Sequence, residues 1–162
     1  MNTTNKTSRA SSNASAFLPQ RLRQFVQGLA ITTSLIAGVA SAQAADLDLN
    51  IGPVASAQGS LMVAIYDSAA NFRNVAVQQQ QLAATAGQMS LRFSNLVPGE
   101  YAIAIFHDSN GNGKLDTNLL GIPKEGYGFS NLTKSLMGPP TWDDVKFAVP
   151  AAGGKLDINL NN

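Results

Sequence analysis

Residues 95–107, Asn-Leu-Val-Pro-Gly-Glu-Tyr-Ala-Ile-Ala-Ile-Phe-His, contain the turn and the strand that decide the fold. Pro98 fixes its own φ and Gly99 accepts a positive φ, a combination typical of a tight turn. Residues 101–107 are apolar at almost every position, which predicts a strand that is covered on both faces. Such a strand is expected at the centre of a sheet rather than at an edge.

Short segments with period-2 alternation of polar and apolar residues recur on either side of this strand. Turn residues separate them, as is typical of half-buried strands. The expected strands are 46–51, 60–66, 74–77 (the weakest candidate), 89–93, 101–107, 145–149 and 155–160. The pattern predicts an all-β chain, a single immunoglobulin-like β-sandwich of about seven strands. The polar run 78–81 is expected to be a solvated segment.

One long stretch, residues 108–143, does not follow the strand rhythm. It holds six glycines and three prolines together with several aromatic residues. A loop of this length is usually either functional or disordered, and its aromatic residues argue against disorder. We expect this Gly/aromatic loop to fold over the second face of the 101–107 strand. Tyr127, Phe129 and Trp142 would then be at least partly buried.

The beginning of this loop has the spacing of a calcium-binding loop. Oxygen-bearing side chains stand at positions 1, 3 and 5, a glycine stands at position 6, and a further carboxylate stands at position 9. The predicted ligands are the side chains of Asp108, Asn110, Asn112 and Asp116 (the last directly or through water) and the backbone carbonyl of Lys114. These are the hard oxygen donors that Ca²⁺ prefers.

The twelfth position departs from the calcium-loop pattern, because Leu119 stands where a bidentate Glu is usual. Glu125 is the candidate for the missing carboxylate, since residues 121–123 can turn the chain back towards the loop. The expected affinity is weak, about 10⁻⁴–10⁻³ M. The alternative interpretation is a polar turn without an ion, because Asn-Gly pairs are also common in hairpins.

The N-terminal segment predicts export. Four basic residues precede an apolar run at 29–40, and the small residues at 42–44 suit a cleavage site. Residues 1–44 are therefore expected to be a cleaved signal peptide, which leaves residues 45–162 as one domain in the periplasm or outside a bacterial cell. The run is short for a membrane span, although an uncleaved N-terminal anchor is the alternative.

The charge pattern excludes some classes of partner. Residues 45–162 carry seven Lys and Arg against ten Asp and Glu, a formal charge near −3. Basic clusters interleaved with aromatic residues are absent, so the sequence does not predict nucleic-acid binding. The chain has no cysteine, so an exported domain would be stable without disulfides.

Catalytic residues are hard to find in this sequence. His107 is the only histidine, and it is a possible general base with Asp108 or Glu125 beside it. The alternative is a structural histidine at a strand end that orients the loop through hydrogen bonds. No motif that would supply a nucleophile accompanies it, so we expect a protein that is not an enzyme.

Three runs together resemble the bacterial secreted family known as domain of unknown function 2141. They are residues 95–102, residues 106–116 and the run Gly-Ile-Pro-Lys-Glu-Gly-Tyr-Gly-Phe-Ser-Asn at 121–131. The resemblance spans about residues 47–160 and implies an exported, single-domain β-sandwich without assigning an activity. The Leu-x-Pro-Gly-x-Tyr turn is also similar to that of prealbumin-like and collagen-adhesin B-type modules, some of which bind calcium in comparable loops.

The sequence therefore predicts a binding or interaction module of the cell envelope that a calcium-type ion stabilises. Its partner would be an envelope protein or a small molecule. The alternatives are a purely structural or interaction module without an ion and, less expected, an enzyme that uses His107.

Overall fold

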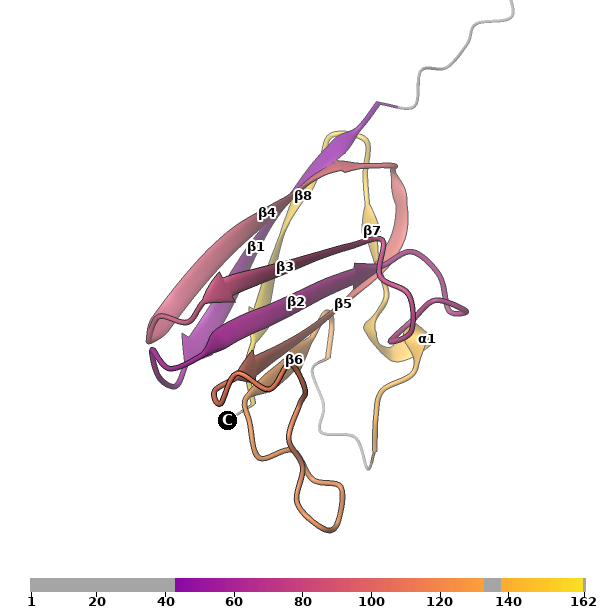
Figure 1. Ribbon diagram of the computed structural model, residues 1–162. Helices are drawn as coiled ribbons and strands as arrows, with labels where there is room; N and C mark the ends of the chain where they lie inside the picture. Colours follow the sequence, from indigo (N-terminus) through magenta and orange to yellow (C-terminus); the bar gives the residue numbers. More distant parts are fainter. Residues whose placement is uncertain (1–42, 133–137, 162) are drawn as a thin grey trace, which may run out of the picture. The chain divides into compact units, whose positions relative to one another are not determined.

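The computed structural model describes residues 43–132 and 138–161, so all but the last two residues of the predicted signal peptide lie outside it. These residues form eight strands and one short helix (Figure 1). In chain order the elements are β1 (Ala45–Val54), β2 (Ser60–Tyr66), β3 (Gln78–Ala83), β4 (Gly87–Leu96), β5 (Gly99–Asp108), β6 (Tyr127–Phe129), α1 (Trp142–Val145), β7 (Phe147–Val149) and β8 (Gly154–Asn159). The predicted all-β class is confirmed.

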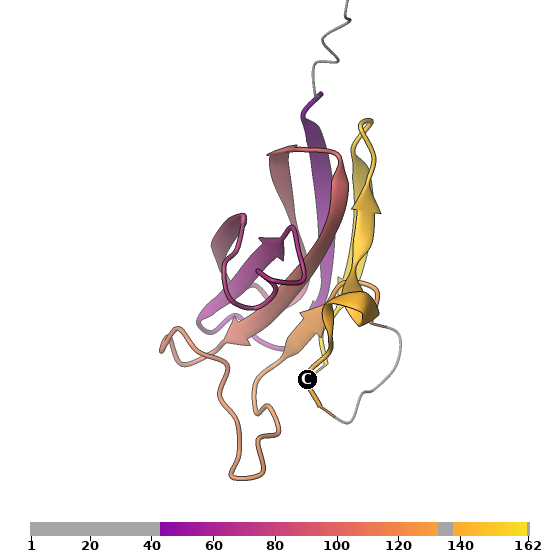
Figure 2. The same ribbon diagram turned by 90° about the vertical axis from the view of Figure 1, so that its right-hand side faces the viewer.

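The strands form two sheets that lie on either side of one core (Figure 2). The first sheet has the order β4-β1-β8, in which β1 pairs antiparallel with β4 and parallel with β8. The second has the order β3-β2-β5-β6, with β7 also paired to β5. β2, β6 and β7 all pair antiparallel with β5, as expected for the strand around which the second sheet is built.

The core follows from the alternation in the sequence. Leu47, Leu49 and Ile51 of β1 are at most 2 % exposed, because successive side chains of a strand point to opposite faces. Ile103 and Ile105 of β5 are buried in the same cluster from the other sheet. The two faces that look inwards therefore form a single hydrophobic core that holds β5 in a fixed position.

A cluster of aromatic side chains lies on the other side of the second sheet. The ring of Phe72, from the connection between β2 and β3, lies 5.5 Å from Tyr66, 6.4 Å from Phe129 and 6.1 Å from Trp142. Tyr127 lies 6.2 Å from Phe129. Tyr127, Phe129 and Trp142 are half-buried, as predicted.

The expected arrangement of the long loop is nevertheless wrong. Residues 127–129 do not fold over the face of the sheet but form β6, which pairs with Ala104–Phe106 along the edge of β5. An extended segment at a sheet edge satisfies its backbone N–H and C=O groups by pairing, whereas lying across the face would leave them unpaired. Aromatic cover for the face comes partly from Phe72, which belongs to a different connection.

Two other predictions are corrected. Residues 74–77 are not a strand, and the run 78–81, expected to be solvated, begins β3. Gln78 and Gln80 are half-buried, and their Nε2 atoms donate hydrogen bonds to the carbonyls of Ser94 (2.9 Å) and Arg92 (2.7 Å) on β4. Because β4 is an edge strand of the other sheet, these amides satisfy carbonyls that no strand pairs.

The last expected strand but one is shorter than predicted. Residues 142–145 form α1, and only residues 147–149 pair with β5. The side chain of Asp144 accepts hydrogen bonds from the N–H (2.8 Å) and the hydroxyl of Thr141. Such capping of a helix start competes with continued extension of the chain. In the part of the chain that the structure describes, no helix is long and apolar enough to cross a membrane.

Candidate metal site

The predicted ion loop begins where β5 ends. The Asp108 side chain, only 2 % exposed, accepts hydrogen bonds from three consecutive backbone N–H groups. Oδ1 accepts from Gly111 (2.9 Å) and Asn112 (3.0 Å), and Oδ2 accepts from Gly113 (2.8 Å). Gly111 and Gly113 have φ of 76° and 74°, which favours glycine at both positions. One carboxylate therefore organises the whole turn.

Two asparagines connect this turn to Asp116. Asn110 Nδ2 donates to Asp116 Oδ2 (2.6 Å) and Asn112 Nδ2 donates to Asp116 Oδ1 (3.0 Å). The Oδ1 atoms of the same asparagines accept the backbone N–H groups of Asn112 (3.1 Å) and Lys114 (2.8 Å). The side chains of Asp108, Asn110, Asn112 and Asp116 thus belong to one hydrogen-bonded loop.

The side chain of Glu125 contacts this loop, although Glu125 lies sixteen residues after Ser109 in the sequence. Its Oε1 accepts hydrogen bonds from the Ser109 N–H (2.9 Å) and the Ser109 hydroxyl (2.8 Å), and its Oε2 accepts from the Asp116 N–H (2.9 Å). The side chain is 8 % exposed. The structure places Glu125 beside the other predicted ligands, with both oxygens used in holding the loop. Its role as a metal ligand stays a prediction.

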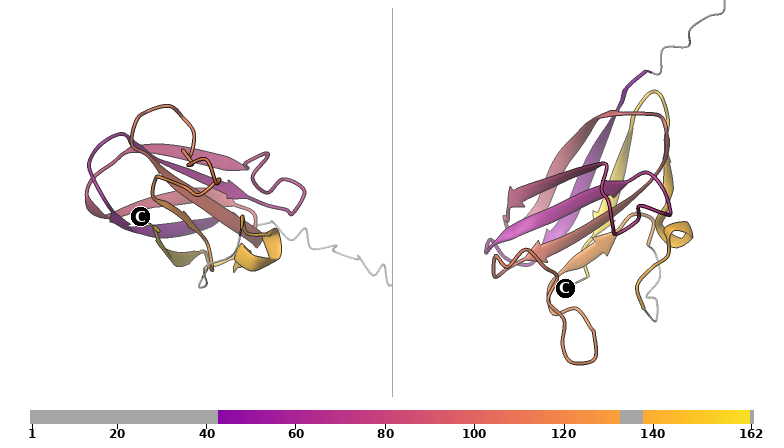
Figure 3. Two further views of the ribbon diagram at one scale, coloured as in Figure 1. Left: turned by 90° about the horizontal axis from the view of Figure 1, so that it is seen from below. Right: turned by 45° about the vertical axis from the view of Figure 1, so that its right-hand side comes forward.

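A short hairpin between Asp116 and Glu125 makes this return possible. The Lys124 N–H donates to the Asp116 carbonyl (2.8 Å), and Thr117 and Pro123 form an antiparallel bridge. The chain therefore leaves the loop and comes back beside its own outgoing segment. Figure 3 shows this excursion (orange) extending beyond the strands.

The donor atoms of the loop fit a hard cation. Two carboxylates and two amide oxygens belong to the oxygen ligands that Ca²⁺ takes six to eight at a time. The residues described include no group of three or more His, Cys, Asp or Glu side chains placed to hold a metal, so an ion here would depend on neutral oxygens as well. The amide nitrogens of Asn110 and Asn112 face Asp116. The Oδ1 atoms accept the backbone N–H groups of Asn112 and Lys114, which fixes this orientation of both amides.

His107 is a buried part of the strand end. It is 3 % exposed, its Nε2 lies 2.7 Å from the carbonyl of Gln58, and its backbone N–H donates to the Gly126 carbonyl (2.8 Å). A carbonyl can only accept, so Nε2 carries the proton in this contact. The ring thus joins the 55–59 turn to β5, which is the structural interpretation considered from the sequence.

Ser130 was not identified from the sequence, although it connects three segments. It is fully buried; its hydroxyl accepts the N–H of Ile103 (2.9 Å) and donates to the carbonyl of Val145 (2.6 Å). Gly128 lies just before it, and a Cβ there would lie 2.8 Å from the Asn159 carbonyl oxygen. This close approach of backbone requires glycine at position 128, whereas no sequence pattern distinguishes Ser130 from other serines.

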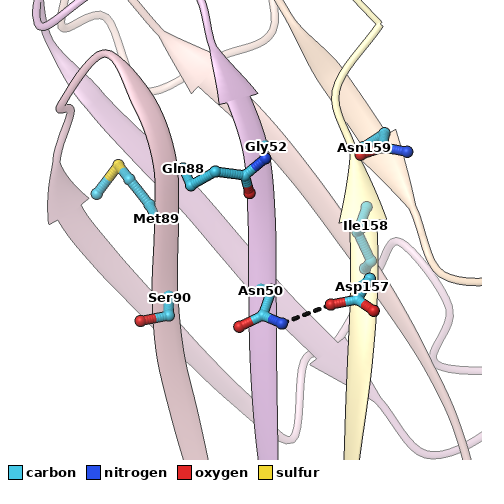
Figure 4. Close-up of a pocket in the computed structure, with 8 residues that line it drawn as sticks. All are labelled: Asn50, Gly52, Gln88, Met89, Ser90, Asp157, Ile158 and Asn159. Carbon is cyan, nitrogen blue, oxygen red and sulfur yellow. Dashed lines mark hydrogen bonds between the residues drawn. The ribbon is translucent and has the colours of Figure 1, made fainter.

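A shallow polar depression of about 460 Å³ lies on the outer face of the first sheet (Figure 4). Asn50 on β1 donates a hydrogen bond of 2.5 Å to Asp157 on β8 across its floor. Its lining residues are Asn50, Gly52, Gln88, Met89, Ser90, Asp157, Ile158 and Asn159. They are mainly the outward positions of the alternating strands, and they lack an aromatic platform or a convergent charge.

Comparison with known proteins connects this chain to one family. No curated protein and no solved structure matches it. A family model described as an uncharacterized protein conserved in bacteria (DUF2141) matches residues 49–158, which include every predicted ligand and most of both sheets. The chain belongs to this bacterial family.

Proposed function

We propose that this protein is an exported β-sandwich module of the bacterial cell envelope whose 108–125 loop is stabilised by a calcium-type ion. The observation that carries the proposal is the convergence of oxygen-bearing side chains from Asp108 to Asp116, with Glu125 returning to the same loop. Binding of an ion by a loop that is folded only in the native state stabilises that state.

The finer fold assignment is also proposed, as an immunoglobulin-like or prealbumin-like sandwich. It is supported by the parallel pairing of the first strand, β1, with the last strand, β8. It is also supported by the hydroxyl of Tyr101, which donates to the carbonyl of Val97 (2.7 Å). Such a tyrosine, bonded back to the chain a few residues upstream, is a feature of many immunoglobulin-like domains.

Export is proposed from the basic and apolar N-terminal segment. It is supported by the start of β1 at Ala45, directly after the predicted cleavage positions. Mass spectrometry of the protein recovered from the periplasm or medium should give an N-terminus at or within a few residues of Ala45. A soluble cytoplasmic protein that retains Met1 would contradict the proposal.

Contacts with a partner are assigned to the aromatic cluster on the second sheet. Phe72, Tyr127, Phe129 and Trp142 are half-buried, so each keeps part of its ring in solvent. Aromatic side chains that are already packed against one another lose little conformational freedom on binding, and aromatic residues are enriched at interfaces. An envelope protein or a small molecule with an apolar face suits this surface.

A second candidate, a structural or interaction module without an ion, is favoured by a specific observation. Asn110 and Asn112 already satisfy the Asp116 carboxylate, and no buried side-chain polar atom among the described residues is without a hydrogen-bond partner. A loop closed in this way is stable as a polar turn. The two candidates differ only in whether a cation replaces the amide donors.

Thermal unfolding with and without Ca²⁺ separates these candidates. With a dissociation constant of about 10⁻⁴–10⁻³ M, Ca²⁺ at ten times Kd should stabilise the protein by about 1.4 kcal/mol. Asp116→Asn should remove the calcium response, and Asp143→Asn, which removes an exposed carboxylate on α1, should keep it. A control in which sodium chloride replaces the calcium salt at equal ionic strength excludes a general salt effect. If Ca²⁺ does not change the melting temperature of the unmodified protein or of either variant, the ion proposal is wrong and the second candidate remains.

A further inference from the structure

The hairpin between Asp116 and Lys124 ends in an unusually exposed apolar tip. Leu119 is fully exposed, Leu120 is 83 % exposed and Ile122 is 55 % exposed. Figure 2 shows this hairpin (orange, at the bottom) projecting away from the strands. Single exposed aliphatic residues are common, but three within four positions at a projecting tip form a concentrated apolar surface.

The tip is a structured turn that holds these side chains outwards. Asn118 Oδ1 accepts the backbone N–H groups of Leu120 (2.9 Å) and Ile122 (3.0 Å). The Asn118 N–H donates to the Ile122 carbonyl (2.8 Å), and the Gly121 N–H donates to the Asn118 carbonyl (3.0 Å). Four backbone N–H groups of the turn, those of Asn118, Leu120, Gly121 and Ile122, are thus paired within it, which lowers the cost of moving the tip into an apolar medium.

Two lysines lie near the tip in the sequence. Lys114 and Lys124 are both exposed, and residues 117–124 contain no acidic side chain. The nearest carboxylates, Asp116 and Glu125, accept hydrogen bonds within the loop but keep their negative charge, so attraction to an anionic surface would depend on Lys114 and Lys124 alone. An apolar tip above two lysines has the arrangement of a segment that meets an anionic membrane surface.

We propose that the tip of the 116–124 hairpin inserts into the surface of a lipid bilayer that contains anionic lipids. Leu119, Leu120 and Ile122 enter the boundary between headgroups and acyl chains, and Lys114 and Lys124 contact the lipid phosphates. Insertion needs no ion in the 108–125 loop, so it is independent of the calcium proposal.

The size and shape of the tip favour a bilayer over a protein partner. A stable protein interface buries roughly 800 Å² on each side, and three aliphatic side chains fall well below that area. The tip is also convex, so it would need a matching cavity in a protein, whereas lipids can surround it on all sides. Binding by so few residues is expected to be weak, on the order of the 10⁴ M⁻¹ of a single myristoyl chain.

The insertion can be followed with one fluorescent label, because the chain has no cysteine of its own. Leu120→Cys, labelled with an environment-sensitive dye, is mixed with phosphatidylglycerol vesicles in a buffer that contains a chelator. Its emission should shift to shorter wavelength. Val97→Cys is the matched control, since Val97 is 62 % exposed but precedes the opposite end of β5. Its label should not shift. No shift at position 120, or equal shifts at both positions, would overturn the proposal.

Variants then test which side chains are responsible. Leu119→Ser with Leu120→Ser should lower vesicle partitioning at least about tenfold, given the transfer free energy of two leucines, while Val97→Ser leaves it unchanged. Lys114→Gln and Lys124→Gln should each weaken binding to anionic vesicles about fivefold and have no effect on zwitterionic vesicles. The N-terminal segment is identical in every variant, so differences report on the hairpin. Undiminished partitioning of the double serine variant, or light scattering that shows a tip-dependent dimer without vesicle binding, would refute membrane insertion.

Discussion

Glu125 holds Ser109 by two hydrogen bonds to one oxygen, from the backbone N–H and from the hydroxyl. Its other oxygen accepts the N–H of Asp116. A single carboxylate thus fixes both ends of the ion loop, although it comes from beyond the hairpin. The 108–116 loop therefore depends for its shape on a residue that is distant in sequence.

Glu125→Gln should destabilise the protein by about 1–3 kcal/mol, because the new amide NH₂ cannot accept the hydrogen bond that one carboxylate oxygen receives. Urea unfolding measures the change. Glu100→Gln is the matched control: Glu100 is an exposed carboxylate whose partner is Lys146, and its loss should cost less than about 0.5 kcal/mol. Equal effects of the two substitutions would contradict the role given to Glu125.

Ser130→Ala should cost about 2–4 kcal/mol, because it leaves both the Ile103 N–H and the Val145 carbonyl without the hydroxyl that joins them. Ser90→Ala, on the exposed face of β4, is the control and should change stability by less than about 0.5 kcal/mol. Thermal or urea unfolding of the two variants provides the comparison. A mild effect at position 130 would mean that water replaces the hydroxyl.

Phe72 and Phe129 should be energetically coupled, since their rings meet edge to face at a centroid distance of 6.4 Å. A double-mutant cycle with Phe72→Leu and Phe129→Leu should give an interaction free energy of about 0.5–1.5 kcal/mol. Phe129→Ala alone should cost about 2 kcal/mol, below the 3–5 kcal/mol of a fully buried phenylalanine, because the ring is only half-buried. Additive effects in the cycle would show that the contact between the two rings adds nothing to stability beyond the burial of each ring alone.

The stability of the protein at alkaline pH should depend on Tyr101. Burial raises the pKa of its phenol above the ordinary value of 10.0, and the negative charge of Asp67 raises this pKa further. The neutral phenol therefore favours the folded state. Its contribution is complete below the unfolded-state pKa of about 10 and is lost as pH rises through the higher folded-state pKa.

Tyr101→Phe removes this titration and should flatten the fall in unfolding free energy above about pH 10. Burial also raises the pKa of Tyr66, which remains in the variant, so some slope persists. At neutral pH the variant should lose about 1 kcal/mol through the missing hydrogen bond to Val97. Parallel pH curves for the two proteins would disprove the assignment.

Local patterns in the sequence predicted the strands whose burial alternates. Leu47, Leu49 and Ile51 revealed β1, and the apolar run at 101–107 revealed β5 as a paired strand. The same reasoning failed for β3, because the cue there is a run of glutamines. Gln78 and Gln80 are half-buried only because their amides reach carbonyls of β4, a distant partner that no local pattern encodes.

The candidate site shows the same division. The spacing of Asp108, Asn110 and Asn112 predicted a compact oxygen-rich turn, because contacts over two to five residues are set by local geometry. Phe72 and Ser130 were missed, since their importance depends on which segments the fold brings next to them. The sequence identified Leu119 only as a departure from the calcium-loop pattern, and the exposed apolar tip that it forms with Leu120 was not predicted.

The parallel pairing of β1 with β8 determines how the domain would respond to a pulling force. Ala45 and Asn159 lie at opposite ends of these adjacent strands. Tension applied between them runs along the strands, so it loads all the hydrogen bonds of the β1–β8 ladder at once rather than one after another. A domain loaded in this shear geometry should unfold at a higher force than one whose terminal strands separate one hydrogen bond at a time.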